Sequence, residues 1–392
     1  MDLEQLLTRG VAEVIVREEL EERLRSGEKL RLKQGFDPSK PDLHIGHAVG
    51  LRKLRQFQDL GHVVVLVVGD WTAQIGDPSG RDESRQMLSR EEVLANAETY
   101  MNQFFKVVDR ERTEVRWQSE WYEGFSLADV LDLTSRFTLA QMMAHDTFRR
   151  RYENGLPITL MELMYPLLQA YDSVMIRADV EFGGTDQKFN NLAGRELQAA
   201  MGQRPQDVLL VPLLLGTDGR KMSKSFGNTI DLDDPPEEMY GKVMSLADGV
   251  LFDYFWLVTD VPEEEIAAMK KAISEGANPR DLKMRLAREI VTQMHSAEAA
   301  QKAEAEFVRV FQRQELPEDM PEVRVPQGAT VMDAIVTAEL AGSRSEARRL
   351  IEQGGVYLDG DRVEALDTAV SFADGSRVLR VGRRRFVRLL PA

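Results

Sequence analysis

The sequence predicts an α/β protein with a doubly wound parallel sheet, and three observations support this prediction. Val63–Val68 is a continuous apolar run, which is typical of a strand buried on both faces of a parallel sheet. Strand-like and helix-like segments alternate from residue 30 to residue 117, as they do when helices connect parallel strands. The chain of 392 residues is long enough for two or three domains with sizeable cores.

The individual elements follow from periodicity, chain breakers and caps. Strands are expected where apolar residues are continuous or alternate with polar ones, at residues 30–34, 63–68, 115–117 and 208–215. Helices are expected where apolar residues recur at helical spacing, at residues 2–26, 45–60 and 162–176. Ser89-Arg90-Glu91-Glu92 is a capping box, so a further helix is predicted from there to about Val108.

Composition and charge exclude several classes of protein. Hydrophobic residues make up 43% and charged residues 29% of the chain, an ordinary balance for a globular protein. The absence of cysteine excludes disulfides and thiolate metal sites. No apolar run is long enough to span a membrane and the N-terminus has no secretion core, so we expect a cytosolic protein. The net charge of −15 does not suggest a nucleic-acid binder, although RNA binding needs only a local basic face.

Two histidines stand at the turn between the first predicted strand and its helix. His44 and His47 are three residues apart on the first helical turn, so their side chains face the same way. Backbone N–H groups and the helix dipole favour an anion at this end, and Gly46 leaves room for a flat purine. The arrangement suits a nucleoside triphosphate, although two histidines at this spacing can also simply pack or face solvent.

A second motif follows the apolar run at 208–215 and the turn Gly216–Gly219. Lys221-Met222-Ser223-Lys224-Ser225 places two lysines on a loop that can swing onto phosphates, although such a loop alone is common on protein surfaces. Together and in this order, the two motifs resemble the hallmark sequences of the class I aminoacyl-tRNA synthetases, His-Ile-Gly-His and Lys-Met-Ser-Lys-Ser. The resemblance implies a Rossmann-like catalytic domain that takes ATP as a substrate.

Three polar side chains on an otherwise apolar helix indicate a pocket wall. Tyr165, Gln169 and Asp172 are spaced by four and three residues and share one helix face, a pattern that partial exposure would also produce. With Gly183–Gln187 following, the set resembles the tyrosyl-tRNA synthetase family over nearly the whole chain. The resemblance implies an enzyme that joins L-tyrosine to ATP as tyrosyl-adenylate, releases pyrophosphate, and transfers tyrosyl to the terminal ribose of tRNA(Tyr).

The same resemblance implies a role for each residue of the site. It places the substrate hydroxyl on Asp172, the α-ammonium on Tyr165, Gln169 and Asp77, and the carboxylate near Gln187. The implied ATP contacts are Ser39, His44, Gly46, His47, Asp186, Lys221 and Lys224. The catalytic residues among them are His44, His47, Lys221 and Lys224. Mg²⁺ would accompany ATP, with no metal site formed by the protein alone and no tightly bound cofactor.

The sequence departs from the family pattern in two places. Lys33-Gln34 precedes the Gly-Phe-Asp-Pro element, where many members have a Tyr that shares the substrate hydroxyl and a Cys that touches the ribose. Gly50 stands where a ribose-contacting Thr is often found. The chain most resembles a bacterial branch with the Lys variant, and the second partner of the substrate hydroxyl stays open.

Changes in composition divide the chain into regions. The pattern predicts a helical region at 233–315 and a proline-rich and acidic linker at 316–328. The resemblance implies that residues 1–232 form the catalytic domain, that 233–315 bind the anticodon and that 329–392 form an RNA-binding domain. Helices at about 119–165 interrupt the α/β alternation. This insertion either packs on its own domain or, as the resemblance implies, forms the interface of a homodimer.

The end of the last region is basic on an otherwise acidic chain. Arginines recur through residues 376–392, which contain no acidic residue, and this favours contacts to a phosphate backbone over a solvated tail. Ser343–Arg348 and Gly355–Gly360 resemble the helix and turn of the small RNA-binding domain first known from the fourth protein of the small ribosomal subunit. The implied tRNA contacts are Arg344, Arg348, Arg349, Arg383, Arg384 and Arg385.

Three other functions fit parts of this pattern. A non-catalytic RNA-binding protein on the same scaffold is disfavoured by the intact His44, His47 and lysine loop. Another adenylate-forming or nucleotidyl-transferring enzyme is disfavoured by the RNA-binding region, and tryptophan as substrate is disfavoured by Asp172. ATP–pyrophosphate exchange and tRNA charging distinguish these possibilities.

Overall fold

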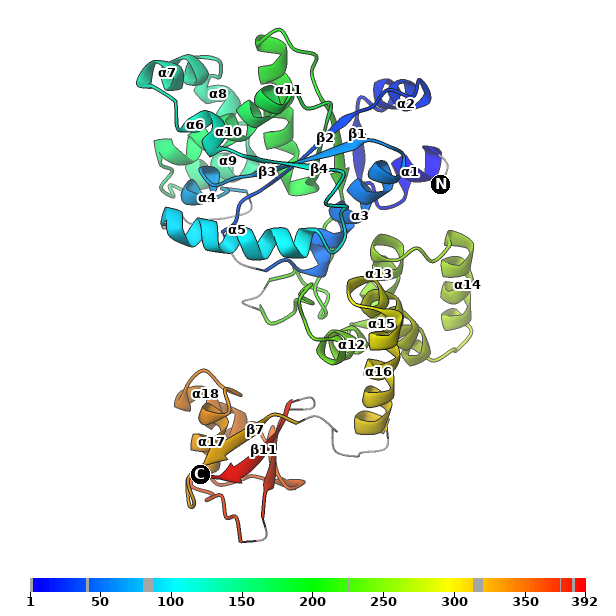
Figure 1. The fold of residues 1–392 in the computed structure, drawn as a ribbon, viewed down its shortest axis with the longest axis vertical. Coiled ribbons are helices and arrows are strands. Elements are labelled where there is room, and N and C mark those ends of the chain that lie inside the picture. The colour runs from blue at the N-terminus through cyan, green and yellow to red at the C-terminus, as the bar shows by residue number, and fades with distance from the viewer. Residues whose placement is uncertain are drawn as a thin grey trace. The chain divides into compact units, whose positions relative to one another are not determined.

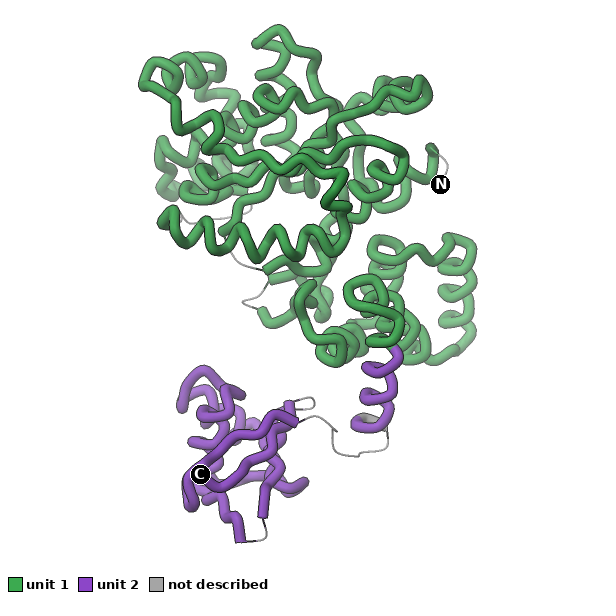
Figure 2. The backbone as a smooth tube through the Cα atoms, viewed as in Figure 1, with its two compact units in different colours: residues 1–300 green, residues 301–392 purple. Residues whose placement is uncertain are grey.

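The computed structural model describes residues 3–39, 42–79, 88–223, 226–312, 320–373, 375–382 and 385–392. They form two compact units, residues 1–300 and residues 301–392 (Figure 2). None of the helices in these ranges has the length and apolar character needed to cross a bilayer.

The first unit is built on a six-stranded sheet with helices on both faces (Figure 1). The strands are β1 (Glu13–Ile15), β2 (Arg31–Phe36), β3 (Val63–Val68), β4 (Thr113–Trp117), β5 (Val180–Gly184) and β6 (Asp207–Val211). Their order is β1-β6-β5-β2-β3-β4, and all are parallel except β1, which runs antiparallel to β6. The predicted doubly wound parallel sheet is confirmed.

The strand order creates a switch point between β2 and β5. From β2 the chain winds outward through β3 and β4, and then returns to place β5 on the other side of β2. The connections on the two sides of this point leave the sheet in opposite directions, so a crevice opens beyond the carboxyl ends of β2 and β5. This geometry fixes where a ligand site can form.

The helices of the first unit connect and cover these strands. Those between β1 and β6 are α2 (Arg17–Arg25), α3 (Ile45–Asp59), α4 (Thr72–Ile75), α5 (Arg90–Phe104), α6 (Ser119–Tyr122), α7 (Leu127–Ser135), α8 (Leu139–Met142), α9 (Asp146–Glu153), α10 (Leu160–Ile176) and α11 (Lys188–Ala200). The predicted capping box opens α5, because the Ser89 hydroxyl accepts from the Glu92 N–H and the Glu92 carboxylate accepts from the Ser89 N–H. Before β1 lies α1 (Leu3–Thr8).

Two sequence predictions in this unit were wrong in their bounds. The helix expected over residues 2–26 is interrupted, because Gly10 adopts a left-handed conformation and the following residues pair with β6 as β1. The strand expected over 208–215 ends at Val211, because Pro212 has no N–H to donate to a sheet ladder.

The predicted helical insertion packs partly on its own domain. Trp121, Tyr122, Leu133 and Met142 from α6, α7 and α8 are buried against residues of β3 and α10. Each such side chain stabilises the fold by roughly 1.5–3 kcal/mol relative to leaving it in water. Other apolar side chains of the insertion stay exposed, and these are considered with the oligomeric state below.

A helical region follows the sheet, as the sequence predicts. It comprises α12 (Pro236–Met244), α13 (Leu251–Val258), α14 (Glu263–Ser274), α15 (Pro279–Met294) and α16 (Ala297–Phe307). The first unit continues through residue 300, so the sheet and the helices from α12 to α15 belong to one compact body.

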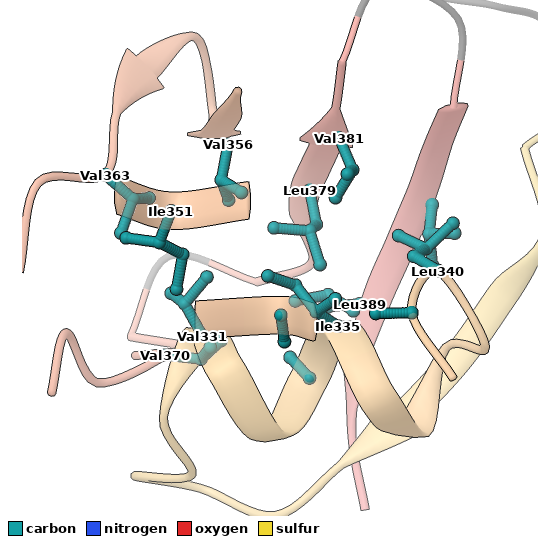
Figure 3. Close-up of a cluster of buried hydrophobic side chains, with 14 of the residues drawn as sticks. Val331, Ile335, Leu340, Ile351, Val356, Val363, Val370, Leu379, Val381 and Leu389 are labelled. Carbon is teal, nitrogen blue, oxygen red and sulfur yellow. The ribbon is translucent and has the colours of Figure 1, made fainter. Parts of the chain in front are cut away.

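The second unit is a five-stranded sheet with the order β7-β11-β10-β8-β9, accompanied by two helices. The elements are β7 (Glu322–Val325), α17 (Val331–Thr337), α18 (Arg344–Glu352), β8 (Val356–Leu358), β9 (Asp361–Arg362), β10 (Arg377–Val381) and β11 (Arg385–Pro391). Figure 3 shows its core, where Ile335, Ile351, Leu379 and Leu389 come together from the helices and strands.

The linker predicted at 316–328 was wrong in its second half. Residues 313–319 lie outside the described residues, but Glu322–Val325 form β7 and pair in parallel with β11. Val325 is fully buried in the core of the second unit, so this apolar residue draws the segment into the sheet. The strand was overlooked because it is short and lies in a segment whose acidic and proline-rich composition is typical of a linker.

Candidate active site

A cavity of about 670 Å³ lies at the carboxyl ends of the central strands. Its walls come from β2, β3, β5, β6, α3, α10 and the loops that follow them. Every predicted ATP or tyrosine residue in the described ranges lines it: Ser39, His44, Gly46, His47, Asp77, Tyr165, Gln169, Asp172, Asp186, Gln187 and Lys221. Lys224 lies outside the described residues. The structure therefore brings together, at the switch point, residues that are distant in the sequence.

The two histidines form the start of α3. His44 is the N-cap residue, and its backbone N–H donates to Nδ1 of His47 at 3.2 Å. The two imidazole centroids lie 4.0 Å apart. A Cβ at residue 46 would lie 3.0 Å from Nδ1 of His44 and 3.4 Å from Sδ of Met222, so Gly46 lets the His44 ring and Met222 approach the backbone. The space expected for a purine at Gly46 is bordered by these two side chains.

A short stretch of backbone pairing connects the two nucleotide motifs. The Ile45 N–H donates to the Ile230 carbonyl, and the Leu232 N–H donates to the Leu43 carbonyl. Residues 230–232 follow the lysine loop, so the start of α3 and the end of that loop are held side by side. Both motifs consequently face the same cavity.

Asn228 holds the base of the lysine loop. This buried side chain accepts from the Ser223 N–H at 2.8 Å and donates to the Lys221 carbonyl at 3.1 Å and to Asp218 at 2.8 Å. A Cβ at residue 216 would lie 2.4 Å from Nδ2 of Asn228, so only glycine fits there. Lys221 thus extends from a fixed base, and Asn228 is a residue that sequence reasoning missed.

Asp172 lies at the floor of the cavity with its carboxylate held by two donors. Nε2 of Gln118 donates to one oxygen at 2.7 Å and Nε1 of Trp121 donates to the other at 3.2 Å. Burial raises the pKa of Asp172 to about 7, against the opposing effects of the Lys33 charge and the Gln118 hydrogen bond. The carboxylate keeps further lone pairs that can accept from a ligand hydroxyl.

Sequence reasoning also missed Gln118 and Trp121, and only Gln118 had a usable signal. Gln118 comes directly after β4, so it sits at the carboxyl end of a parallel strand, where ligand-binding residues gather. Its amide oxygen accepts from the N–H groups of Trp71 and Thr72, which fixes the amide with its nitrogen toward Asp172. Trp121 lies within α6 and does not directly follow a strand, so it gave no such signal.

Two further carboxylates, Asp37 and Asp77, line the same cavity. Tyr165 donates its hydroxyl to Asp37 at 2.8 Å, and Thr72 donates to the other oxygen of Asp37 at 2.6 Å. Nε2 of Gln187 donates to Asp77 at 2.7 Å. This group of acidic side chains favours a cation such as an ammonium group.

Asp186 lies in the same wall and feels both burial and a neighbouring charge. Burial raises the pKa of this carboxyl, and the negative charge of Asp77 raises it further. A Cβ at residue 184 would lie 2.6 Å from Oδ1 of Asp186, so the glycine leaves the room that the Asp186 carboxylate occupies. The carboxylate remains an acceptor at the cavity wall, as a ribose hydroxyl requires.

The structure also places the two residues that depart from the family pattern. Lys33 is fully buried, 2.8 Å from a carboxylate oxygen of Glu181, and is not among the described residues that line the cavity. Gln34 lines the cavity. A Cβ at residue 50 would lie 3.8 Å from Val211, which is an ordinary van der Waals contact. A residue larger than glycine could therefore place its Cβ here without a clash.

The described part of the chain has no group of three or more His, Asp or Glu side chains arranged to hold a metal ion. Oxygen donors from a nucleotide are the usual ligands of Mg²⁺ when a protein provides no cage. The acidic side chains of the cavity are hydrogen-bonded to amides and hydroxyls, as Asp77, Asp37 and Asp172 show.

The predicted tRNA residues of the second unit gather on and near α18. Arg344, Arg348 and Arg349 are exposed on this helix, where Arg344 pairs with Asp333 and Arg348 with Glu352. Arg385 donates to the carbonyl of Leu340, in the segment between α17 and α18. Arg383 and Arg384 lie outside the described residues.

Comparison with protein families matches the chain almost completely. The family model of class I tRNA synthetases for tryptophan and tyrosine matches residues 25–312. The model of the C-terminal domain of tyrosine–tRNA ligases matches residues 312–389. The two matches meet at residue 312, which lies within the second compact unit.

Curated relatives and solved structures agree with these matches. Tyrosine–tRNA ligase of Dehalococcoides mccartyi is 59% identical over 98% of this chain and 97% of the relative. That of Thermotoga maritima is 53% identical over 98% of this chain and 96% of the relative. A tyrosyl-tRNA synthetase from Archaeoglobus fulgidus complexed with L-tyrosine has a TM-score of 0.62 at 25% identity, covering 76% of this chain and 98% of that chain.

A more distant structure shows the fold alone. A C-terminally truncated mitochondrial tyrosyl-tRNA synthetase from Aspergillus nidulans has a TM-score of 0.65 at 23% identity, covering 79% of this chain and 93% of that chain.

Class I tRNA synthetases use ATP as a substrate, which agrees with the two nucleotide motifs at the cavity. The chain belongs to the class I tRNA synthetases of the tryptophanyl and tyrosyl family, and within it to the tyrosine–tRNA ligases.

Proposed function

We propose that the chain activates L-tyrosine with ATP and then transfers the tyrosyl group to the terminal ribose of tRNA(Tyr). The observation that supports this best is the buried Asp172, which lines the same cavity as His44, His47 and Lys221. A carboxylate held by Gln118 and Trp121 offers an acceptor to a phenolic hydroxyl in an otherwise enclosed place. Phenylalanine would leave that acceptor without its partner.

The first step needs no nucleophile from the protein. The tyrosine carboxylate attacks the α-phosphorus of ATP, a new carboxylate–phosphorus bond forms, and the bond to the bridging oxygen of pyrophosphate breaks. His44 and His47 at the start of α3, together with Lys221 and Lys224, would stabilise the charge that develops on the phosphates. Mg²⁺ would enter with ATP and neutralise part of that charge. The protein's own contribution is to hold the two reactants in line.

The amino-acid end of the substrate would be oriented by polar contacts. Asp172 would accept from the hydroxyl, and Asp77, Tyr165 and Gln169 would surround the α-ammonium. Gln187 contacts Asp77 at 2.7 Å, which supports its place beside the same end of tyrosine. Asp186 would accept from a ribose hydroxyl, and Ser39 would contact phosphate.

In the second step the terminal ribose hydroxyl of tRNA attacks the tyrosyl carbonyl of the adenylate, an ester bond to the ribose forms, and the bond to AMP breaks. We infer that the second unit binds tRNA through Arg344, Arg348, Arg349 and the arginines at 383–385. Three of these arginines are exposed on one helix, which suits a phosphate backbone. The helical region from residue 233 is our candidate for anticodon contacts.

The exposed apolar side chains of the insertion support a homodimer. Leu127, Leu131, Leu139, Tyr152 and Leu160 are 74%, 61%, 65%, 72% and 82% exposed, respectively. Large apolar side chains that cluster on consecutive elements mark an interaction surface in soluble proteins. A second copy of this chain is the partner that we propose for it. A cytosolic location remains a prediction from composition.

Pyrophosphate exchange tests the proposed activity. We expect ATP–pyrophosphate exchange that depends on L-tyrosine and is far slower with each of the other standard amino acids. Charging of total tRNA with tyrosine should follow. Exchange that is fastest with tryptophan, or exchange without tRNA charging, would contradict the proposal.

A further inference from the structure

The buried pair of Lys33 and Glu181 lies at the switch point of the sheet. The two residues are opposite each other in neighbouring parallel strands, Lys33 on β2 and Glu181 on β5. Nζ of Lys33 is 2.8 Å from Oε1 of Glu181, and the two side chains are 0% and 2% exposed. Lys33 also donates to the carbonyl of Gln169 and to the hydroxyl of Ser173, each at 2.7 Å. Its three donors therefore all have partners, and two of the partner residues, Gln169 and Glu181, themselves line the cavity.

The same carboxylate determines the orientation of the Gln169 amide. Nε2 of Gln169 donates to Oε1 of Glu181 at 3.2 Å and to Oδ1 of Asn191 at 3.1 Å. An amide nitrogen has two hydrogens, so both are committed. An ionised carboxylate can only accept, so turning the amide over would set two oxygens against each other. Of the side-chain amide, only the oxygen Oε1 of Gln169 is then left for a ligand in the cavity that this residue lines.

Glu181 is itself fixed from a third side. Its Oε2 accepts from Nε2 of Gln206 and from the hydroxyl of Ser173. A Cβ at residue 194 on α11 would come within 2.7 Å of Gln206, 3.0 Å of Ser173 and 3.2 Å of Glu181. Gly194 thus allows α11 to close over the network, and the carboxylate has little freedom to move.

We propose that Lys33 and Glu181 are positioning residues that hold the Gln169 amide with its oxygen toward the cavity, so that the site selects the α-ammonium group of its substrate. This inference rests on the proposed place of Gln169 at that ammonium group. It also removes Lys33 as a partner of the substrate hydroxyl. The ammonium group of Lys33 already contacts the Gln169 backbone carbonyl, the Ser173 hydroxyl and the Glu181 carboxylate.

The proposal has a measurable consequence for ligand choice. The amide oxygen of Gln169 can accept from an ammonium ion and stabilises it. If the amide were turned over, its NH₂ group would place two donors against the donors of the ammonium ion. The pair should therefore affect the preference for L-tyrosine over 3-(4-hydroxyphenyl)propanoate, which is tyrosine without its amino group. A role confined to folding would weaken the binding of both compounds alike.

The experiment compares the dissociation constants of these two compounds for the full chain and its variants. In Glu181→Gln the new amide can present either atom, so the Gln169 amide is free to turn. The preference for tyrosine should fall at least about tenfold, the effect of losing one hydrogen bond to a charged group. The double variant Lys33→Gln, Glu181→Gln removes both charges of the pair, so that neither is left without the other, and its preference should fall in the same way.

Two controls separate the possible failures. Glu162→Gln breaks another buried pair, in which Glu162 lies 2.7 Å from Arg151, and should lower stability without changing the preference. Gln169→Leu should reduce the preference if Gln169 meets the ammonium group at all. If Gln169→Leu has this effect and both Glu181 variants do not, the positioning role is overturned while the proposed site stands. A double variant that cannot fold would also overturn the proposal, because the pair would then serve folding.

Discussion

At the scale of single residues, the cavity contains carboxylates whose neighbours decide what each can do. Asp172 is buried and held by Gln118 and Trp121, whereas Asp37 accepts from the Tyr165 hydroxyl and Asp77 from the Gln187 amide. The same kind of side chain can therefore bind a hydroxyl in one place and an ammonium group in another. The predictions at this scale concern the phosphate contacts and the charge of Asp172.

Removing a phosphate contact should slow the first step without affecting tyrosine binding. We expect His47→Ala and Lys224→Ala each to slow adenylate formation by about 100- to 1,000-fold, because these contacts strengthen as charge develops in the transition state. Single-turnover formation of tyrosyl-adenylate measures the effect, and the dissociation constant of tyrosine is the control. Unchanged rates in both variants would show that the phosphates lie elsewhere.

The raised pKa of Asp172 predicts how stability depends on pH. Burial raises this pKa to about 7 in the folded chain, whereas an unfolded Asp titrates near its ordinary value of 3.8. The folded state therefore binds the proton more tightly, and this contribution to stability is present below about pH 4 and is lost as the pH rises through about 7. Replacing the group by Asn removes the effect.

Urea unfolding from pH 4 to pH 8 tests the predicted direction in which stability changes with pH. The free energy of unfolding of the wild type, minus that of Asp172→Asn, should fall by up to a few kcal/mol over this range. A difference that is constant across the range would mean that Asp172 is ionised in the folded protein throughout.

The motif residues were predictable from the sequence because each motif is contiguous. His44, His47 and Lys221 could be assigned from local patterns, and Tyr165, Gln169 and Asp172 from spacing along one helix. Gln118 and Trp121 hold Asp172 through hydrogen bonds to a segment more than fifty residues away, and only the place of Gln118 after β4 gave a hint of this. Asn228 was missed although its partners lie close in the chain, because no local pattern shows that its side chain folds back on the lysine loop. Glu181 was hidden in a strand whose pairing with β2 the sequence did not reveal.

At the scale of elements, short strands escaped sequence reasoning while long periodic ones did not. β3 and α10 were predicted closely, because continuous or helically spaced apolar residues identify them directly. β1 and β7 are three and four residues long, so neither has enough positions to show a period. Each forms because a neighbouring strand, β6 or β11, provides its hydrogen bonds.

The helical insertion provides the prediction that belongs to this scale. Leu127 and Leu131 lie one turn apart on α7, and both are exposed. We expect Leu131→Asp to weaken a homodimer at least tenfold, because a buried carboxylate without a partner opposes association. Analytical ultracentrifugation over a concentration series measures this effect.

Leu60→Asp is the matched control for the dimer prediction. Leu60 is 52% exposed, but it follows α3 and lies outside the insertion, so its substitution should leave association unchanged. A wild-type chain that sediments as a monomer at micromolar concentration would contradict the proposed dimer.

At the scale of the whole molecule, the chain has two compact units whose boundary falls between residues 300 and 301. The strand β7 belongs to the second unit, so a clean truncation must end before Glu322. A chain that ends at residue 312 keeps the first unit and removes the sheet and helices that carry the predicted tRNA arginines. The two activities can thus be separated.

We expect the truncated chain to form tyrosyl-adenylate at the rate of the full chain and to charge tRNA poorly. The affinity of the full chain for tRNA should fall steeply with salt, because each arginine–phosphate contact releases a counterion. The truncated chain should show a shallower salt dependence and weaker binding. Equal affinities across the salt series would rule out tRNA binding by the second unit.

The choice between tyrosine and phenylalanine tests the central claim most directly. The measurement is kcat/KM for pyrophosphate exchange with both amino acids, in the wild type and in Asp172→Ala. The variant should lose much of its activity with tyrosine and less with phenylalanine, because only tyrosine donates a hydrogen bond to the buried carboxylate. We predict that the ratio falls by at least about tenfold, or about 1.4 kcal/mol. An unchanged ratio would contradict the account and would mean that the hydroxyl is recognised elsewhere, with Gln34 the next residue of the cavity to test.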